Sequence, residues 1–304
     1  MELVLNIPQE KLEQISGYLF ALGCEGINVS SDHITIYFTK HRWSQEVKMG
    51  IIEFVSQIIP QFGSRDIRIK ALSNQDWTQN WKQYFTAKKI TTQIIVKPPW
   101  DEYNQQEGEC VIVINPKMAF GTGYHESTQL VIMALEKRIN PGMHVLDVGT
   151  GSGILTIISD KLGAEEVLGI DNDINAIRNA VENAKLNKSS TNARFILGYL
   201  EQFEPKEYDL IVANINVKVL LDYAGLFADF LKLNGMLIIS GFLRSDESKM
   251  LDRYQKFGFI NLEKNTKKDW LSLIFKLKEK KKPETKPDNI KPQQIDVSLP
   301  TDGY

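Results

Sequence analysis

The sequence predicts an α/β protein with a mostly parallel sheet in its larger, C-terminal part and a small α+β domain before it. From about residue 140, short apolar strands alternate with helices, which is typical of β-α-β crossovers and of a parallel sheet covered on both faces. Residues 1–72 show the order β-α-β-β-α-β, which is the split ferredoxin-like motif. The length of 304 residues also indicates about two domains.

The N-terminal domain is predicted from alternating strands and from helices with one apolar face. The first helix begins at Pro8 and ends at Gly23, and Pro60 ends the second, because proline suits a first helical turn but cannot continue a helix. The predicted strands cover 2–7, 27–29, 34–38 and 67–71, and the predicted helices cover 8–22 and 44–59.

Residues 73–92 are predicted to be a linker that contains one short amphipathic helix. Trp77, Trp81 and Tyr84 recur there near helical spacing, and we expect their rings to pack on a domain surface.

The second domain is predicted over residues 93–277. Because no helix separates its last two strands, we expect them to form an antiparallel hairpin at one edge of the sheet. Residues 278–304 contain Lys-Pro repeats and few large apolar residues, so we expect a disordered tail. The predicted strands are 94–97, 111–114, 144–148, 167–170, 195–197, 210–213, 237–240, 259–262 and 271–277; the helices are 154–162, 174–186, 219–231 and 245–257.

Composition excludes several classes of function. A net charge of -2 lacks the basic excess of nucleic-acid-binding proteins, so no direct nucleic-acid partner is expected. Two cysteines, Cys24 and Cys110, form neither a disulfide framework nor a zinc site, and we expect no metal. The sequence has no apolar run long enough to span a membrane and no basic start typical of a signal peptide. We expect a cytoplasmic monomer.

A glycine-rich turn follows the strand 144–148. Its sequence is Asp147-Val148-Gly149-Thr150-Gly151-Ser152-Gly153, and the helix after it offers unpaired N–H groups. The spacing Gly-x-Gly-x-Gly differs from the dinucleotide fingerprint, and the leading acid Asp147 disfavours a phosphate and suits a ligand with an ammonium group.

A second acid, Asp171, ends the next strand, where a carboxylate can hold the diol of a ribose. A nucleoside that has an amino-acid group and no phosphate is S-adenosylmethionine, which we therefore predict as the cofactor. Asp173 is expected only to cap the following helix.

Two further segments are candidates for the site. Residues 118–128 form a loop able to fold over a cofactor, in which Thr128 either caps the next helix or contacts the ligand, and His125 is a candidate base or a hydrogen-bonding residue. The strand 210–213 ends at Asn214, at the carboxyl edge where ligands of open α/β sheets bind. The Asn214 side-chain carbonyl is a hydrogen-bond acceptor for an attacking amine, although a turn asparagine is an equal interpretation of this segment alone.

These segments resemble the ribosomal protein L11 methyltransferase (PrmA) family. The similarity extends to about Lys276 and includes Asp76-Trp77, Asn80-Trp81, Met118-Ala119-Phe120-Gly121-Thr122-Gly123, Asp147 to Gly153, Gly169-Ile170-Asp171 and Ala213-Asn214-Ile215. The resemblance implies a ferredoxin-like domain that recognises the ribosomal protein L11, and a Rossmann-like class I methyltransferase domain. It implies methylation of lysine ε-amines and of the N-terminal α-amine of L11.

The resemblance also assigns roles to residues. The positions that match its cofactor contacts are Thr128, Gly149, Asp171 and Asn214, and Phe120, Thr122 and Gly151 match the lining of the same pocket. Asn214 is the candidate catalytic residue, which aims the amine at the methyl group in an in-line displacement.

Three alternative functions are weighed. The first is a relative that methylates a lysine of another protein. The second is an RNA-binding module, which is disfavoured because residues 1–72 contain seven Lys and Arg against eight Asp and Glu. The third is a nicotinamide dehydrogenase, which is disfavoured by the glycine spacing and by Asp147.

Overall fold

The structure is a computed structural model, and it describes residues 2–7, 11, 15, 18–19, 22–24, 26–29, 33–39, 42–70, 85–116, 121–280 and 295–296. The chain divides into two compact units, Met1–Tyr84 and Phe85–Tyr304. The predicted helix over 8–22 lies mostly outside the described residues, and Trp77, Trp81 and Tyr84 lie wholly outside them.

The first unit contains a four-stranded sheet in which all paired neighbours are antiparallel, in the order β2-β3-β1-β4. Its helix α2 begins after Ser44, whose side chain accepts a hydrogen bond from the Val47 amide at 3.3 Å. Ile51 and Val55 of this helix are buried against the apolar face of the sheet. The elements are β1 (Glu2–Leu5), β2 (Gly26–Val29), β3 (Ile34–Tyr37), α2 (Gln45–Ile58), η2 (Ser64–Asp66) and β4 (Ile67–Lys70).

The second unit begins with a small three-stranded sheet, β5 (Lys88–Lys89), β6 (Ile94–Lys97) and β7 (Cys110–Val113). Lys88 and Lys89 pair with Val96 and Ile95, so the part of the predicted linker after residue 84 belongs to this unit.

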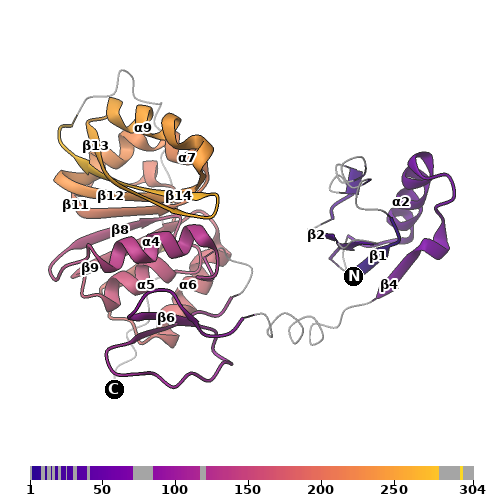
Figure 1. The fold of residues 1–304 in the computed structure, drawn as a ribbon, viewed down its shortest axis with the longest axis horizontal. Coiled ribbons are helices and arrows are strands. Elements are labelled where there is room, and N and C mark those ends of the chain that lie inside the picture. Colours follow the sequence, from indigo (N-terminus) through magenta and orange to yellow (C-terminus); the bar gives the residue numbers. More distant parts are fainter. Residues whose placement is uncertain are drawn as a thin grey trace. The chain divides into compact units, whose positions relative to one another are not determined.

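An eight-stranded sheet forms the centre of the second unit (Figure 1). Its order is β13-β14-β12-β11-β8-β9-β10-β15, and the neighbours from β10 to β12 are all parallel. β14 is antiparallel to β12 and β13, which confirms the predicted hairpin. The strands are β8 (His144–Val148), β9 (Glu166–Asp171), β10 (Ala193–Leu197), β11 (Tyr208–Asn214), β12 (Leu231–Leu243), β13 (Phe259–Lys267), β14 (Trp270–Leu277) and β15 (Ile295–Asp296).

Helices cover both faces of this sheet, as the alternating pattern predicts. α4 (Glu126–Glu136), α5 (Ile154–Lys161) and α6 (Ile174–Leu186) share one apolar core, and α7 (Val217–Asp222), α8 (Ala224–Phe230) and α9 (Glu247–Lys256) share the other. The short helices η3 (Leu200–Gln202) and η4 (Arg244–Asp246) lie between these elements. The α/β fold with a predominantly parallel sheet is therefore confirmed.

β12 begins at Leu231 and β13 ends at Lys267, so both strands are longer than predicted, and two further details differ. The helix predicted over 219–231 is interrupted at Tyr223, which ends α7 and whose hydroxyl donates a hydrogen bond to the Glu201 carboxylate at 2.5 Å. In the tail, Ile295 and Asp296 pair with Leu197 and Ile196 of β10, so these two residues are not disordered as predicted. They occupy free backbone groups of an edge strand. The residues from 281 to 294 and from 297 to 304 lie outside the described part.

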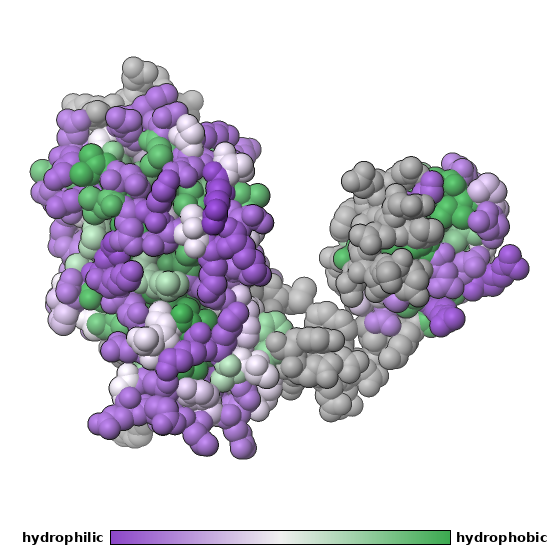
Figure 2. Space-filling model, in the orientation of Figure 1, coloured by the Kyte–Doolittle hydropathy of each residue, from purple (hydrophilic) through white to green (hydrophobic). Residues whose placement is uncertain are grey.

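The surface of the larger unit is mainly polar on the face that Figure 2 presents, where apolar side chains form small, separate groups. Among the described helices, none is both long and apolar enough to span a membrane.

Candidate active site

The carboxyl edge of the sheet brings together the motifs that are far apart in the sequence. Asp171 ends β9, Asn214 ends β11, and the glycine-rich turn follows β8, which pairs with both of these strands. This edge, between β8 and its neighbours, is where open α/β sheets bind their ligands.

The turn after β8 has no room for a side chain at its first glycine. Gly149 has a φ of 75°, and a Cβ atom there would lie 2.3 Å from Cγ2 of Ile215. The amides of Gly149 and Thr150 both donate to the Ile170 carbonyl at 2.9 Å, which fixes the turn against the end of β9. The backbone of this turn is therefore held in place, and Ile215 occupies the space beside Gly149.

The Asp171 carboxylate is partly exposed and organises the next part of the site. One oxygen accepts from the Gly151 amide at 2.9 Å, and the other accepts from the Asp173 amide at 3.0 Å. Each carboxylate oxygen can accept further hydrogen bonds, so Asp171 retains the capacity to hold two hydroxyl groups. The Asp173 side chain accepts from the Asn175 amide at 2.8 Å and caps α6, as predicted.

The Asp147 carboxylate bonds within the turn, although the sequence also suggests that it would attract an ammonium group. Its side chain is fully buried, and its Oδ2 accepts from the hydroxyls of Thr150 and Thr156 at 2.7 and 2.8 Å. Desolvation raises the pKa of this carboxyl to about 6, while the two threonine hydroxyls oppose the shift. Asp147 therefore stabilises the turn from within through Oδ2. Its Oδ1 is a buried acceptor without a donor among the described residues, so the expected contact with an ammonium group stays a prediction.

Asn214 lies beside Thr128, 86 positions away in the chain. The Asn214 amide Nδ2 donates to the Thr128 hydroxyl at 3.1 Å, and the Asn214 side chain is 7% exposed. Among the described residues nothing donates to the Asn214 Oδ1, which is a buried acceptor. Since a buried acceptor without a partner is unfavourable, Oδ1 is suited to a donor that a ligand would bring.

Thr128 does not cap α4. His125 occupies the cap position, where its Nδ1 accepts from the Ser127 amide at 3.3 Å, and its ring packs edge-on against Trp270 at 4.4 Å. The interpretation of His125 as a hydrogen-bonding residue thus fits the geometry better than that of a base.

The loop before α4 is only partly described. Thr122 is half-buried next to Gly121, whereas Phe120 lies outside the described residues. The Gly121 carbonyl accepts a hydrogen bond from the Ser152 hydroxyl at 2.5 Å, so this end of the loop contacts the glycine-rich turn.

Sequence reasoning missed two residues that shape this edge. Ser152 lies inside the glycine-rich turn, but no role was predicted for it. Asn183, on α6, is fully buried and donates to the Ser152 carbonyl at 2.9 Å. The available signal was the repeat of asparagine at 179, 183 and 187, at intervals of four, on one face of a predicted helix.

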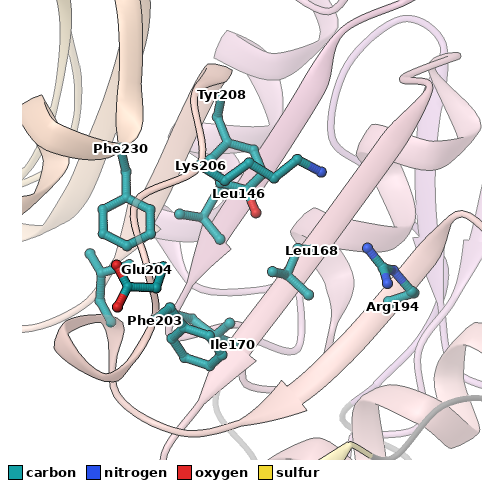
Figure 3. A pocket seen from close by; sticks show the side chains of 10 residues that line it. Leu146, Leu168, Ile170, Arg194, Phe203, Glu204, Lys206, Tyr208 and Phe230 are labelled. Atoms are coloured by element: carbon teal, nitrogen blue, oxygen red, sulfur yellow. The ribbon is translucent and has the colours of Figure 1, made fainter.

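A separate cavity of about 180 Å³ lies on the sheet face under the segment between β10 and β11 (Figure 3). Leu146, Leu168 and Ile170 line its apolar side, and Arg194 and Lys206 also line it. None of the described candidate site residues lines this cavity. Within the described ranges, no cluster of His, Cys, Asp or Glu has the composition of a metal site.

Comparison with known proteins identifies similar chains. A family model described as "Ribosomal protein L11 methyltransferase (PrmA)" matches residues 1–278. A protein of Acetivibrio thermocellus named "Ribosomal protein L11 methyltransferase" is 38% identical over 205 residues, which is 67% of this chain and 65% of that protein. A Clostridium perfringens protein with the same name is 30% identical over 300 residues, covering 88% of this chain and 96% of that protein.

A solved structure is also similar to this chain. The crystal structure of a "ribosomal protein L11 methylase" from Lactobacillus delbrueckii subsp. bulgaricus is 30% identical, with a TM-score of 0.61. The match covers 64% of this chain and all of that chain.

Proposed function

Because the chain belongs to the ribosomal protein L11 methyltransferase (PrmA) family, we propose that it methylates lysine ε-amines and the N-terminal α-amine of ribosomal protein L11. It is an S-adenosylmethionine-dependent methyltransferase with a class I methyltransferase fold. The assignment of the individual site residues is part of the proposal.

The buried Asn214 Oδ1 is the observation that carries the proposal for the site. It lies at the carboxyl end of β11, on a side chain fixed by Thr128, and has no donor among the described residues. A primary amine can donate an N–H hydrogen bond to this oxygen, and the lone pair of its nitrogen then points away from Asn214.

The residues at this edge fit S-adenosylmethionine. Asp171 would hold the ribose hydroxyls, and the backbone of the glycine-rich turn, in which Gly149 and Gly151 have φ angles of 75° and 55°, would lie against the cofactor. Thr122 and Phe120 complete the proposed pocket, Phe120 from its position in the family motif alone. S-adenosylmethionine supplies a methyl group on a sulfonium, which is already activated for displacement.

The remaining work of the protein is to bind and orient a neutral amine. A lysine with a pKa near 10.4 is almost fully protonated at neutral pH, and removing its proton there costs roughly 4 kcal/mol. A weakly solvated site disfavours the ammonium form, so the proton can leave to water before the amine binds. Asn214 would then fix the direction of the amine, and orientation of this kind contributes several kcal/mol, on the order of 7 or more in favourable cases.

Replacing Asn214 tests this role. We expect Asn214→Ala to fold and to bind S-adenosylmethionine, but to transfer methyl groups to L11 about 10- to 100-fold more slowly, because one buried hydrogen bond to the amine is lost. Rates come from mass spectrometry of purified L11 at saturating cofactor. Asn216→Ala, an exposed change two residues along the chain, is the control. An Asn214→Ala rate equal to that of the wild type would remove Asn214 from the mechanism.

The first unit supplies the recognition of the protein substrate in this proposal. Its antiparallel sheet and the helix α2 form their own core, and the family model includes it. We further propose that residues 1–72 form a ferredoxin-like domain and that the enzyme acts as a cytoplasmic monomer. Methylation of a lysine in another protein, but not in L11, would support the alternative that this enzyme has a different protein substrate.

A further inference from the structure

Two asparagines of α6 and a third at its C-terminal cap bond to the backbone of the segment that leads into the candidate cofactor loop. Asn187 accepts from the Val113 amide at 2.7 Å and donates to the Val113 carbonyl at 2.6 Å. Asn183 accepts from the Asn115 amide at 2.9 Å, and Asn179 donates to the Asn115 carbonyl at 3.4 Å. The side-chain amides thus pair with an extended segment as a neighbouring strand would.

Asn183 differs from the other two because it also contacts the glycine-rich turn. Its Nδ2 donates to the Ser152 carbonyl at 2.9 Å, and its side chain is fully buried. The side-chain amide of Asn183 therefore connects Asn115, which precedes the loop 118–128, with Ser152 in the turn.

Ser152 contacts the loop 118–128 itself, at Gly121. Its hydroxyl donates to the Gly121 carbonyl at 2.5 Å, and the serine is fully buried. Gly121 has a φ of 94°, and a Cβ atom there would lie 3.1 Å from the Ser152 Oγ, so the backbone approaches the serine closely. Asn115, which precedes the loop 118–128, and Gly121, which lies in it, are thus both tied to the turn through two side chains.

We infer that Ser152 and Asn183 are positioning residues that set the affinity for S-adenosylmethionine by holding Asn115 and Gly121 against the glycine-rich turn. This inference rests on the proposed function, which places the cofactor at this turn and at Thr122, the neighbour of Gly121. Neither side chain is assigned a contact with the methyl group or the amine. Their loss should therefore weaken binding of the cofactor and leave the rate at saturating cofactor nearly unchanged.

The test measures the Kd of S-adenosylmethionine by calorimetry, together with kcat and KM for this cofactor on L11, in the full chain. We expect Ser152→Ala and Asn183→Leu each to raise Kd and KM about tenfold, and kcat to stay within about threefold of the wild type. In the double variant the effects should be less than additive, because both residues hold one loop.

Matched controls separate positioning from general stability. Ser159→Ala removes another buried serine, whose hydroxyl bonds only within α5 to the Leu155 carbonyl at 2.8 Å among the described contacts. Asn187→Leu removes the asparagine that bonds to Val113 but has no described contact with the turn. Both controls should lower the melting temperature and leave Kd within about twofold.

The outcomes are distinguishable. If the wild type does not bind S-adenosylmethionine, the proposed function fails. If the wild type binds it and Ser152→Ala and Asn183→Leu bind equally well, or if the control variants weaken binding as much, the positioning role is overturned. Should Asn183→Leu not fold, Ser152→Ala and Ser159→Ala decide the question alone.

Discussion

At the residue scale, burial separates the roles of the two aspartates at the glycine-rich turn. Asp147 is fully buried and bonds to two threonine hydroxyls, whereas Asp171 is partly exposed and bonds to backbone amides at the edge. Asp171 is thus accessible to a ligand without rearrangement. Asp147 keeps one buried oxygen, Oδ1, that has no donor among the described residues.

The buried carboxyl of Asp147 should make stability depend on pH. Its folded-state pKa of about 6 lies above the ordinary value of 3.8 for an aspartate, so the wild type loses stability as pH rises from about 4 to 6. The full loss is roughly 3 kcal/mol at about 1.36 kcal/mol per pKa unit. We expect Asp147→Asn, whose amide oxygen can still accept from both threonines, to be more stable than the wild type at pH 8, and the difference to shrink toward pH 4.

Urea unfolding of the ligand-free protein at pH 4, 5, 6 and 8 measures this difference. Thr156→Val, which removes one hydroxyl at the same carboxylate, serves as the control and should destabilise the protein at pH 8. An Asp147→Asn advantage that does not change with pH would contradict the burial of a charged carboxylate.

Asp171→Ala should weaken binding of S-adenosylmethionine about 100-fold or more, because two charge-assisted hydrogen bonds to the ribose and the support of the Gly151 amide are lost together. Calorimetry with S-adenosylmethionine gives the Kd. Wild-type affinity in this variant would show that Asp171 does not hold the ribose.

The types and positions of the site residues were predictable from sequence, but the contacts between them were not. The end of β11 at Asn214 follows from an apolar strand that meets a polar residue. The side-chain hydrogen bond between Asn214 and Thr128 joins residues 86 positions apart, and it depends on how α4 packs against the sheet. For Asp147, the sequence shows that an acid precedes the turn, but not that its carboxylate is buried and bonded to Thr150 and Thr156.

At the element scale, the order of the parallel strands from β8 to β12 was predicted, although β12 begins at Leu231, which was assigned to a helix, and not at Leu237. β8 and α6 have the predicted bounds, because short apolar runs and a capped helix carry strong local signals. The interruption between α7 and α8 was missed, because the apolar pattern continues through Tyr223.

The cap of α6 gives a prediction that contrasts with Asp171. Asp173→Ala should lower the free energy of unfolding by about 1 kcal/mol, because the Asn175 amide loses its acceptor at the start of α6. The Kd for S-adenosylmethionine should stay within about threefold, since the backbone amide of residue 173 still bonds to Asp171. Chemical unfolding and calorimetry measure the two quantities. Loss of cofactor binding without loss of stability would reverse the roles of these two aspartates.

At the scale of the whole molecule, the proposal assigns a different task to each of the two units. The first buries Leu3, Leu5 and Ile36 in a core of its own, and every described site residue belongs to the second. Binding of the cofactor and recognition of the protein substrate should therefore be separable.

A chain that contains residues 85–280 alone tests this separation. We expect it to fold around its two apolar cores and to bind S-adenosylmethionine within about threefold of the full chain, because the residues proposed to hold the cofactor lie in this unit. Its kcat/KM for L11 should fall by about 100-fold or more, since the surface proposed to bind the substrate is absent. A chain of residues 1–280 is the control for removal of the tail, whose two described paired residues add little to the sheet. Methylation of L11 by 85–280 at the rate of 1–280 would show that the second unit recognises the substrate by itself, and the first unit would then need another role.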